Sequence, residues 1–257
     1  GTVEVTGNVT TGFAVKAEGD IIVNGVVEGA TLISGGNIVL KRGMQGMDRG
    51  MLQAEGNITA KFLENCKVRC KGMLKADAIL HSDVECQENV DILGKKGLIN
   101  GGSLSTYADV HATTLGSTMG ASTKIKIISD KELIIRANEI KAEVENKEET
   151  LQKIDEVVNR VKGQLASNQE VLPEQMNYLK QATVNKPLLV KQIRELREER
   201  EKLLVRIEKN KHSCIRVEGA VYSGIDITVK DVSKVQHEQV SHCRFVRDGA
   251  DVRIVGL

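Results

Sequence analysis

The stretch from Ala60 to Val84, AKFLENCKVRCKGMLKADAILHSDV, contains the same short unit twice. The first copy begins at Leu63 and the second at Ile79, sixteen residues later, and Gly56 and Gly72 precede the two copies in the same register. A repeat of this length is typical of stacked repeat architectures, in which each copy forms one layer. The period of the repeat, more than any single residue, therefore predicts the fold.

The same unit extends in both directions through the first half of the chain. Its small or turn-prone residue recurs at Gly12, Gly29, Gly46, Asn65, His81, Gly97 and Gly116. A second motif, glycine followed by Asn or Asp and an aliphatic residue, begins at Gly7, Gly19, Gly36 and Gly56. Strands this short cannot bury a face alone, but wound as a coil each pairs with its equivalent in the next turn. The pattern predicts a mainly β fold, a parallel β-helix, and the variable period favours the right-handed kind.

The recurring position also defines a candidate interaction surface. Gly, Asn and His adopt positive φ more readily than most residues, so Asn65 and His81 are expected to be corner residues of the coil. If the sixteen-residue register continues, Asn65, His81 and Gly97 align on successive turns, with Glu64 and Lys96 beside them. We therefore expect any interaction surface here to consist of Glu64, Asn65, His81, Lys95 and Lys96.

The pattern changes to a heptad repeat near Ser129. Apolar residues then alternate spacings of three and four, at Ala137, Ile140, Val144, Leu151, Ile154, Val158, Val161 and Leu165, with Lys147 in the same seam. A second seam contains Leu189, Ile193, Leu196, Arg200, Leu203 and Ile207. The tip between them is expected in SNQEVLPE, from Ser167 to Glu174, and Pro187 either kinks the returning helix or begins its main segment.

These patterns predict a discontinuous β-helix with an inserted arm. Residues 1–128 and 211–257 are expected to form the β-helix, because Gly219-Ala220 and Gly249-Ala250 reproduce the corner motif after the helices. Residues 129–210 are expected to form a coiled-coil arm. Since the chain must return to the stack, an antiparallel hairpin within one chain is favoured over pairing between two molecules. A homo-oligomer is the remaining alternative.

Composition excludes several classes of function. Lys+Arg 36 against Asp+Glu 35 leaves no net field that would attract nucleic acid, and an aromatic content of 2% leaves few platforms for bases or sugars. No apolar run is long enough to cross a membrane. Five cysteines without CxxC spacing indicate reduced thiols and a cytoplasmic location. The chain starts at Gly1 within a β-like pattern, so an N-terminal part is expected to be missing.

No residue pattern indicates catalysis or a bound cofactor. A Glu-His-Lys patch from Glu64, His81 and Lys96 could transfer protons, but no Asp/Glu pair recurs at one register. His and Cys lie close in sequence at His212 and Cys214, yet no ligand set matches a known zinc spacing. We expect no enzyme activity, no cofactor and no metal. A β-helix carbohydrate-active enzyme is the least favoured alternative.

Four segments resemble the bacterial flagellar assembly protein A family. They are VVEGATL from Val26, AKFLENCKV from Ala60, AILHSDV from Ala78 and GKKGLINGG from Gly94. The resemblance implies a right-handed β-helix with a helical arm, and a role in flagellar assembly or motility, with a sugar phosphotransferase component as one partner. It brings no catalytic residues. We therefore expect a cytoplasmic scaffold that binds protein partners, with self-assembly like that of bactofilin-type cytoskeletal proteins as the alternative.

Overall fold

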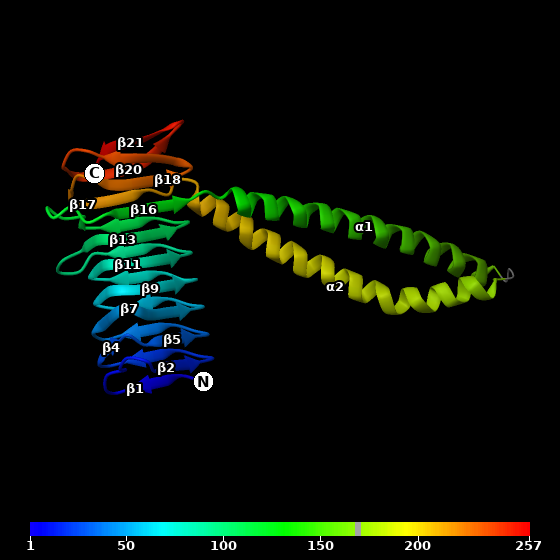
Figure 1. Ribbon diagram of the computed structural model, residues 1–257. Helices are drawn as coiled ribbons and strands as arrows, with labels where there is room; N and C mark the ends of the chain where they lie inside the picture. The colour runs from blue at the N-terminus through cyan, green and yellow to red at the C-terminus, as the bar shows by residue number, and fades with distance from the viewer. Residues whose placement is uncertain (168–170) are drawn as a thin grey trace. The chain divides into compact units, whose positions relative to one another are not determined.

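The computed structural model describes residues 1–167 and 171–257. The chain divides into two compact units, one made of Gly1–Asp130 with Lys209–Leu257 and the other of Lys131–Glu208. The first is a parallel coil of about seven turns, and the second is a pair of helices (Figure 1). The parallel β-helix and the inserted helical hairpin predicted from the sequence are confirmed.

Short strands make up the first unit. Before the helices these are β1 (Val3–Val5), β2 (Ala14–Ala17), β3 (Ile21–Val23), β4 (Val26–Glu28), β5 (Thr31–Ser34), β6 (Ile38–Leu40), β7 (Gly43–Ala54), β8 (Ile58–Thr59), β9 (Phe62–Cys70), β10 (Leu74–Ala76), β11 (Ala78–Cys86), β12 (Val90–Ile92), β13 (Leu98–Thr106), β14 (Val110–Ala112), β15 (Thr114–Leu115) and β16 (Thr123–Ile128). After the helices come β17 (Ile215–Val221), β18 (Ile225–Lys230), β19 (Val232–Gln236), β20 (Val240–Asp248) and β21 (Asp251–Gly256).

The turns of the coil build three parallel sheets. The first sheet stacks β1, β3, β6, β8, β10, β12, β14 and β17. The second stacks β4, the first half of β7, β9, β11 and β13, then β15 and the end of β17. The third stacks β2, β5, the second half of the same long strands, then β16 and β18. The long strands therefore bend around the corner between the second and third sheets.

Equivalent apolar residues stack inside the coil and form one continuous core. In the first sheet, one inward position is fully buried on seven successive strands, at Ile21, Ile38, Ile58, Leu74, Val90, Val110 and Ile215. Burying an aliphatic side chain of this size stabilises a fold by about 1.5 to 3 kcal/mol. Each turn thus depends on its neighbours, as expected for a solenoid.

The corner between the second and third sheets confirms the interpretation of Asn65 and His81. Both residues have φ of 48°, and Gly12 and Gly29 also have positive φ. The assignment of Gly97 was wrong: Leu80 and Ser82 pair with Asn100 and Gly102, so Gly101 (φ 77°) is the equivalent of His81. The segment from Leu93 to Gly97 lengthens this turn to twenty residues, from Ala78 to Leu98, and shifts the register.

Three further corner assignments differ in the structure. At Gly46 the corner is longer, and Met47 and Asp48 have the positive φ values, 50° and 59°. Gly219 lies at an irregularity within β17, where the register to β20 shifts. Gly249 (φ 61°) lies in the tight turn between β20 and β21, which pair antiparallel. The returning segment therefore does not repeat the corner motif.

The end of the coil changes from parallel to antiparallel pairing. Strand β18 pairs with β19, and β17 pairs with β20, which in turn pairs with β21, all antiparallel. Short connections suffice for antiparallel neighbours, whereas another parallel turn needs a long one. The last strands therefore form a cap of different topology.

The second unit is an antiparallel hairpin of α1 (Lys131–Ala166) and α2 (Pro173–Asn210) (Figure 1). Ile140, Val144 and Ile193 form its buried centre, so the seam closes within one chain. Pro187 lies inside α2, which changes direction part-way along its length. Of the expected tip, residues 168–170 lie outside the described residues. Neither described helix is apolar enough over sufficient length to cross a membrane.

Candidate functional site

The structure brings Glu64, Lys95 and Lys96 together. They line a hollow of about 360 Å³ on the second sheet, which we call the lysine hollow; it is lined by Lys61, Phe62, Glu64, Asp77, Ala78, Leu80, Lys95 and Lys96. Asn65 and His81 do not line it, because they lie at the corner beyond it. The expected surface is thus divided between a hollow and an adjoining corner.

The long turn before β13 builds one side of the lysine hollow. A Cβ atom at Gly94 would lie 2.0 Å from Cγ of Asp77, so this backbone passes directly over Asp77. Only glycine permits such a close approach. The extra residues of the same turn carry Lys95 and Lys96 to the hollow. The segment that shifts the repeat register therefore contributes Lys95 and Lys96 to the lining of the lysine hollow.

The chemistry of the lysine hollow suits an acidic, partly apolar partner. Three ammonium groups, from Lys61, Lys95 and Lys96, surround it with two carboxylates, from Glu64 and Asp77. Within the described residues, no ion pair connects these five groups. Phe62, Ala78 and Leu80 contribute the apolar part of the lining. The hollow therefore presents unpaired charge beside apolar surface.

His81 has a structural role, because its imidazole packs against the backbone of the next turn. A Cβ atom at Gly101 would lie 2.4 Å from Nδ1 of His81, so the imidazole covers the corner glycine of the next turn. Among the described residues, no hydrogen bond joins His81 to Glu64 or Lys96. Acid–base catalysis needs such groups within hydrogen-bonding reach of one another or of a shared water. Within the described residues, these three side chains therefore make no direct bond of this kind with one another.

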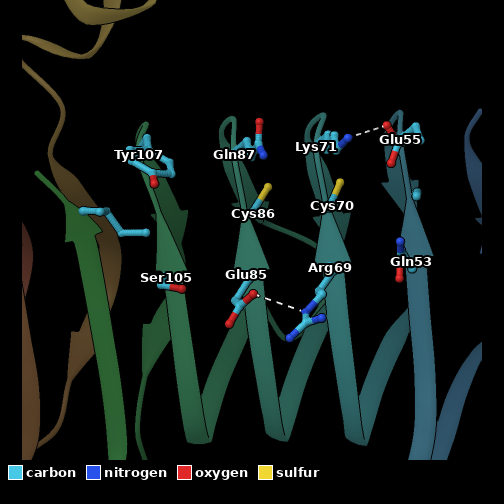
Figure 2. A pocket seen from close by; sticks show the side chains of 12 residues that line it. Gln53, Glu55, Arg69, Cys70, Lys71, Glu85, Cys86, Gln87, Ser105 and Tyr107 are labelled. Atoms are coloured by element: carbon cyan, nitrogen blue, oxygen red, sulfur yellow. Dashed lines mark hydrogen bonds and ion pairs between the residues drawn. The ribbon is translucent and has the colours of Figure 1, made fainter. Parts of the chain in front are cut away.

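A second hollow, of about 340 Å³, lies on the third sheet (Figure 2). Its rim carries two ion pairs between neighbouring turns, Lys71 with Glu55 at 2.5 Å and Arg69 with Glu85 at 3.3 Å. Both pairs are largely exposed, and such pairs contribute between nothing and about 1 kcal/mol. The four charged side chains of this rim are therefore paired with each other.

Cys70 and Cys86 lie on adjacent turns beneath this second hollow (Figure 2). The Cys70 thiol donates to the carbonyl of Gly56 at 3.2 Å, and the Cys86 thiol donates to that of Gly72 at 3.0 Å. Their shared contact lowers the pKa of Cys70 and, together with burial, raises that of Cys86. Ser34, on an earlier turn of the same column, donates to Gly19 in the same way. Cys70 and Cys86 therefore occupy the same position in their turns as Ser34 does in its own, and their thiols donate the same kind of hydrogen bond as its hydroxyl.

A ladder of side-chain oxygens at the corner between the third and first sheets was not predicted as such. Asp20 accepts from the amide of Asn37 at 2.6 Å, and Asn37 accepts from that of Asn57 at 2.8 Å. Asn57 then accepts from the amide of Met73 at 2.7 Å. The Gly-Asn motif contained this signal, because an amide oxygen at a repeated corner can bond the next turn.

The described residues contain no group of three or more His, Cys, Asp or Glu side chains placed to hold a metal ion. The two hollows described above lie on a coil whose turns are joined by side-chain hydrogen bonds.

A family model matches nearly the whole chain. It is FapA, described as the Flagellar Assembly Protein A beta solenoid domain, and it covers residues 1–252. The chain belongs to this family. The parallel β-solenoid with its helical hairpin is therefore the structure of a member of this family. The resemblance seen in the sequence is confirmed. Comparison with curated proteins and with solved structures produced no match.

Proposed function

We propose that this FapA-family chain is a non-enzymatic scaffold that binds protein partners in flagellar assembly or motility control. Family membership supports the association with flagellar assembly. The observation that carries the scaffold role is the hairpin of 36 and 38 residues, inserted between β16 and β17, each of which pairs with other strands of the coil. The coil does not need the hairpin for its strand pairing, so the hairpin is available for another task.

The surface of the hairpin supports protein binding. Val184 is 73% exposed and Leu188, one helical turn later, is 58% exposed. Adjacent apolar side chains on a helix surface offer a contact to a second protein. The lysine hollow would supply a second, acid-selective contact. Flagellar assembly factors and an acidic component of the sugar phosphotransferase system are the partners we propose, in preference to nucleic acid.

The absence of enzyme activity is part of the proposal. Polar side chains at the corner between the third and first sheets are engaged in hydrogen bonds between turns, as Asn37 and Asn57 are. The four charged side chains that line the second hollow form two ion pairs, so both of its carboxylates are paired with cations. We also propose a cytoplasmic location, because the five cysteines are free thiols and four of them are buried.

Deleting the hairpin tests the scaffold role. In the variant, residues 131–208 are replaced by a short glycine–serine linker, since Asp130 and Asn210 are buried and should be kept. Cross-linking in cells followed by mass spectrometry should show loss of flagellar assembly proteins, with unchanged far-UV signal from the β-strands. Retention of all cross-linked partners in a folded variant would count against the hairpin as the binding element.

A charge reversal separates the lysine hollow from the hairpin. Lys95→Glu with Lys96→Glu should weaken capture of acidic partners. Lys124→Glu with Lys126→Glu, at two exposed lysines on the third sheet, is the matched control with the same change of charge. Equal effects of both changes would mean that general surface charge, and not the hollow, attracts the partner. Light scattering of the purified chain over a range of concentrations tests self-assembly at the same time.

A further inference from the structure

A third hollow lies near the capped end of the coil. It has a volume of about 360 Å³ and is lined by Lys211, His212, Ser213, Cys214, Lys230, Arg244, Val246 and Arg247. We call it the basic hollow. Residues 211–214, which precede β17, meet the end of β18 and the middle of β20 there. Its size is within the range of small-molecule sites.

The lining of the basic hollow has one sign of charge. Four cationic side chains line it, and the described lining residues include no carboxylate. Lys230 contacts the buried Asp130 at 3.6 Å, and Arg247 contacts Asp231 at 2.8 Å. Within the part of the chain that the structure describes, Arg244 has no such partner. A wall of this kind attracts anions, since neighbouring cations add their potentials.

Arg244 also lies directly opposite a second arginine. In the antiparallel pair of β17 and β20, Arg216 and Arg244 are register partners. No ion pair compensates Arg216 among the described residues either. Like charges placed directly across an antiparallel pair destabilise the sheet. Both guanidinium groups influence Cys214, which lines the hollow: burial raises the pKa of that thiol, while Arg216 and Arg244 act to lower it.

We propose that the basic hollow binds a small oxyanion of the phosphate class. Four cationic side chains, those of Lys211, Lys230, Arg244 and Arg247, line the hollow, and Arg216 is the register partner of Arg244. An oxyanion of the phosphate class carries the opposite charge and offers these side chains several acceptor oxygens. Planar guanidinium groups also bond two oxygens of one phosphate at once. This site is independent of the proposed scaffold role.

Calorimetric titration with orthophosphate and with pyrophosphate tests the proposal on the intact chain. Sodium chloride at matched ionic strength is the reference in each titration. The native chain should show saturable heat with at least one of the two probes, and the tighter probe identifies a mono- or diphosphate site. Arg244→Gln should weaken binding by about tenfold or more, because a charge-assisted bond is lost. Heat no larger than that with sodium chloride would overturn the proposal.

A matched arginine provides the control. Arg253 lies on β21, outside the lining, and contacts Asp248 at 3.3 Å. Arg253→Gln should leave the affinity unchanged, and equal weakening by both variants would contradict a local site. Thermal unfolding in phosphate-free buffer adds a second measurement: Arg244→Gln should unfold at the same or a higher temperature, since it removes the unpaired charge opposite Arg216. A lower unfolding temperature would show that Arg244 serves stability and would overturn the assignment.

Discussion

Asn65 and His81 occupy a backbone conformation that most residues avoid. Both have φ of 48°, where an L side chain crowds its own backbone and where β-branched residues are most strained. The equivalent position of the next turn is Gly101, whose missing Cβ makes room for the imidazole of His81. One backbone requirement thus explains residues that in the sequence also resembled a polar active site.

Two substitutions at His81 should separate backbone strain from any binding role. His81→Gly should be tolerated or slightly stabilising, whereas His81→Val should lower the free energy of unfolding by about 1 kcal/mol or more. Lys67→Val, at an exposed strand position without positive φ, should change stability little. Urea unfolding measures all three. If both His81 variants abolish partner binding at unchanged stability, the corner interpretation is wrong.

Cys66 should make the fold sensitive to alkaline pH. Burial, with a smaller contribution from Glu64, raises the pKa of its thiol from 9.0 to about 11, against a lowering effect of Ser82. Below pH 9 the thiol is neutral in both states, so its contribution is fully present. As the pH rises from 9 to 11, the unfolded thiol ionises first, and stability on the order of 2 kcal/mol is lost.

Urea unfolding of the native chain and of Cys66→Ala, at pH 8 and pH 10.5 with reductant, measures this contribution. The variant should be less stable at pH 8, because a buried side chain is truncated, but should lose less stability between the two pH values. An identical loss in both proteins would mean that Cys66 does not cause the alkaline sensitivity.

At the scale of the strand and its turn, hydrogen bonds and close approaches explain the Gly-Asn motif together. Oδ1 of Asp20 accepts from the amide and from the side chain of Asn37. The same oxygen would lie 2.3 Å from a Cβ atom at Gly36. Gly36 is therefore needed because the preceding turn fills the space of a side chain, and not because of its own φ.

A double-mutant cycle tests this coupling. Asp20→Ala should cost about 1 to 3 kcal/mol through lost charge-assisted hydrogen bonds, and Gly36→Ala should be destabilising through the clash. The double variant should be more stable than the sum of the two predicts, because the clashing oxygen is gone. If the two losses in the free energy of urea unfolding are additive, Asp20 and Gly36 are not coupled and the interpretation is wrong. Asn24→Ala, which removes an exposed bond to Glu4, is the control and should change little.

The hairpin differs from the strands in how polar residues enter its seam. Lys147 occupies a seam position and donates to Gln192 at 3.1 Å, and Lys186 bonds Asp155. Polar pairs of this kind fix the register of two helices at a cost in stability. The described helices therefore have a defined alignment but a small apolar centre.

At the scale of the molecule, two units with separate cores should lose stability separately. Ile140 is fully buried in the hairpin, so Ile140→Ala should reduce hydrogen-exchange protection of α1 and α2 by the equivalent of about 2 to 4 kcal/mol. Protection of the coil strands should stay unchanged. Ile134→Ala, at a position 44% exposed, is the matched control. Equal loss of protection in both units would show that they unfold together.

The period of the repeat and the heptad seams were sufficient to predict the coil, the hairpin and the corner role of Asn65 and His81. These features are local, because they follow from spacing along the chain and from the φ preference of single residues. The register around Gly97 could not be predicted. The length of the inserted segment becomes known only from the strand pairs on either side of it, which the structure provides. The same insertion placed Lys95 and Lys96 beside Glu64.

Contacts between distant segments were decided by the tertiary structure alone. Strand β17 returns after the hairpin to pair with β14, and β20 then places Arg244 opposite Arg216. No period or motif connects these residues, because antiparallel pairing at the cap follows no repeat. The sequence by itself therefore determined the architecture and the family, while the three hollows depend on which turns and strand ends are brought together in space.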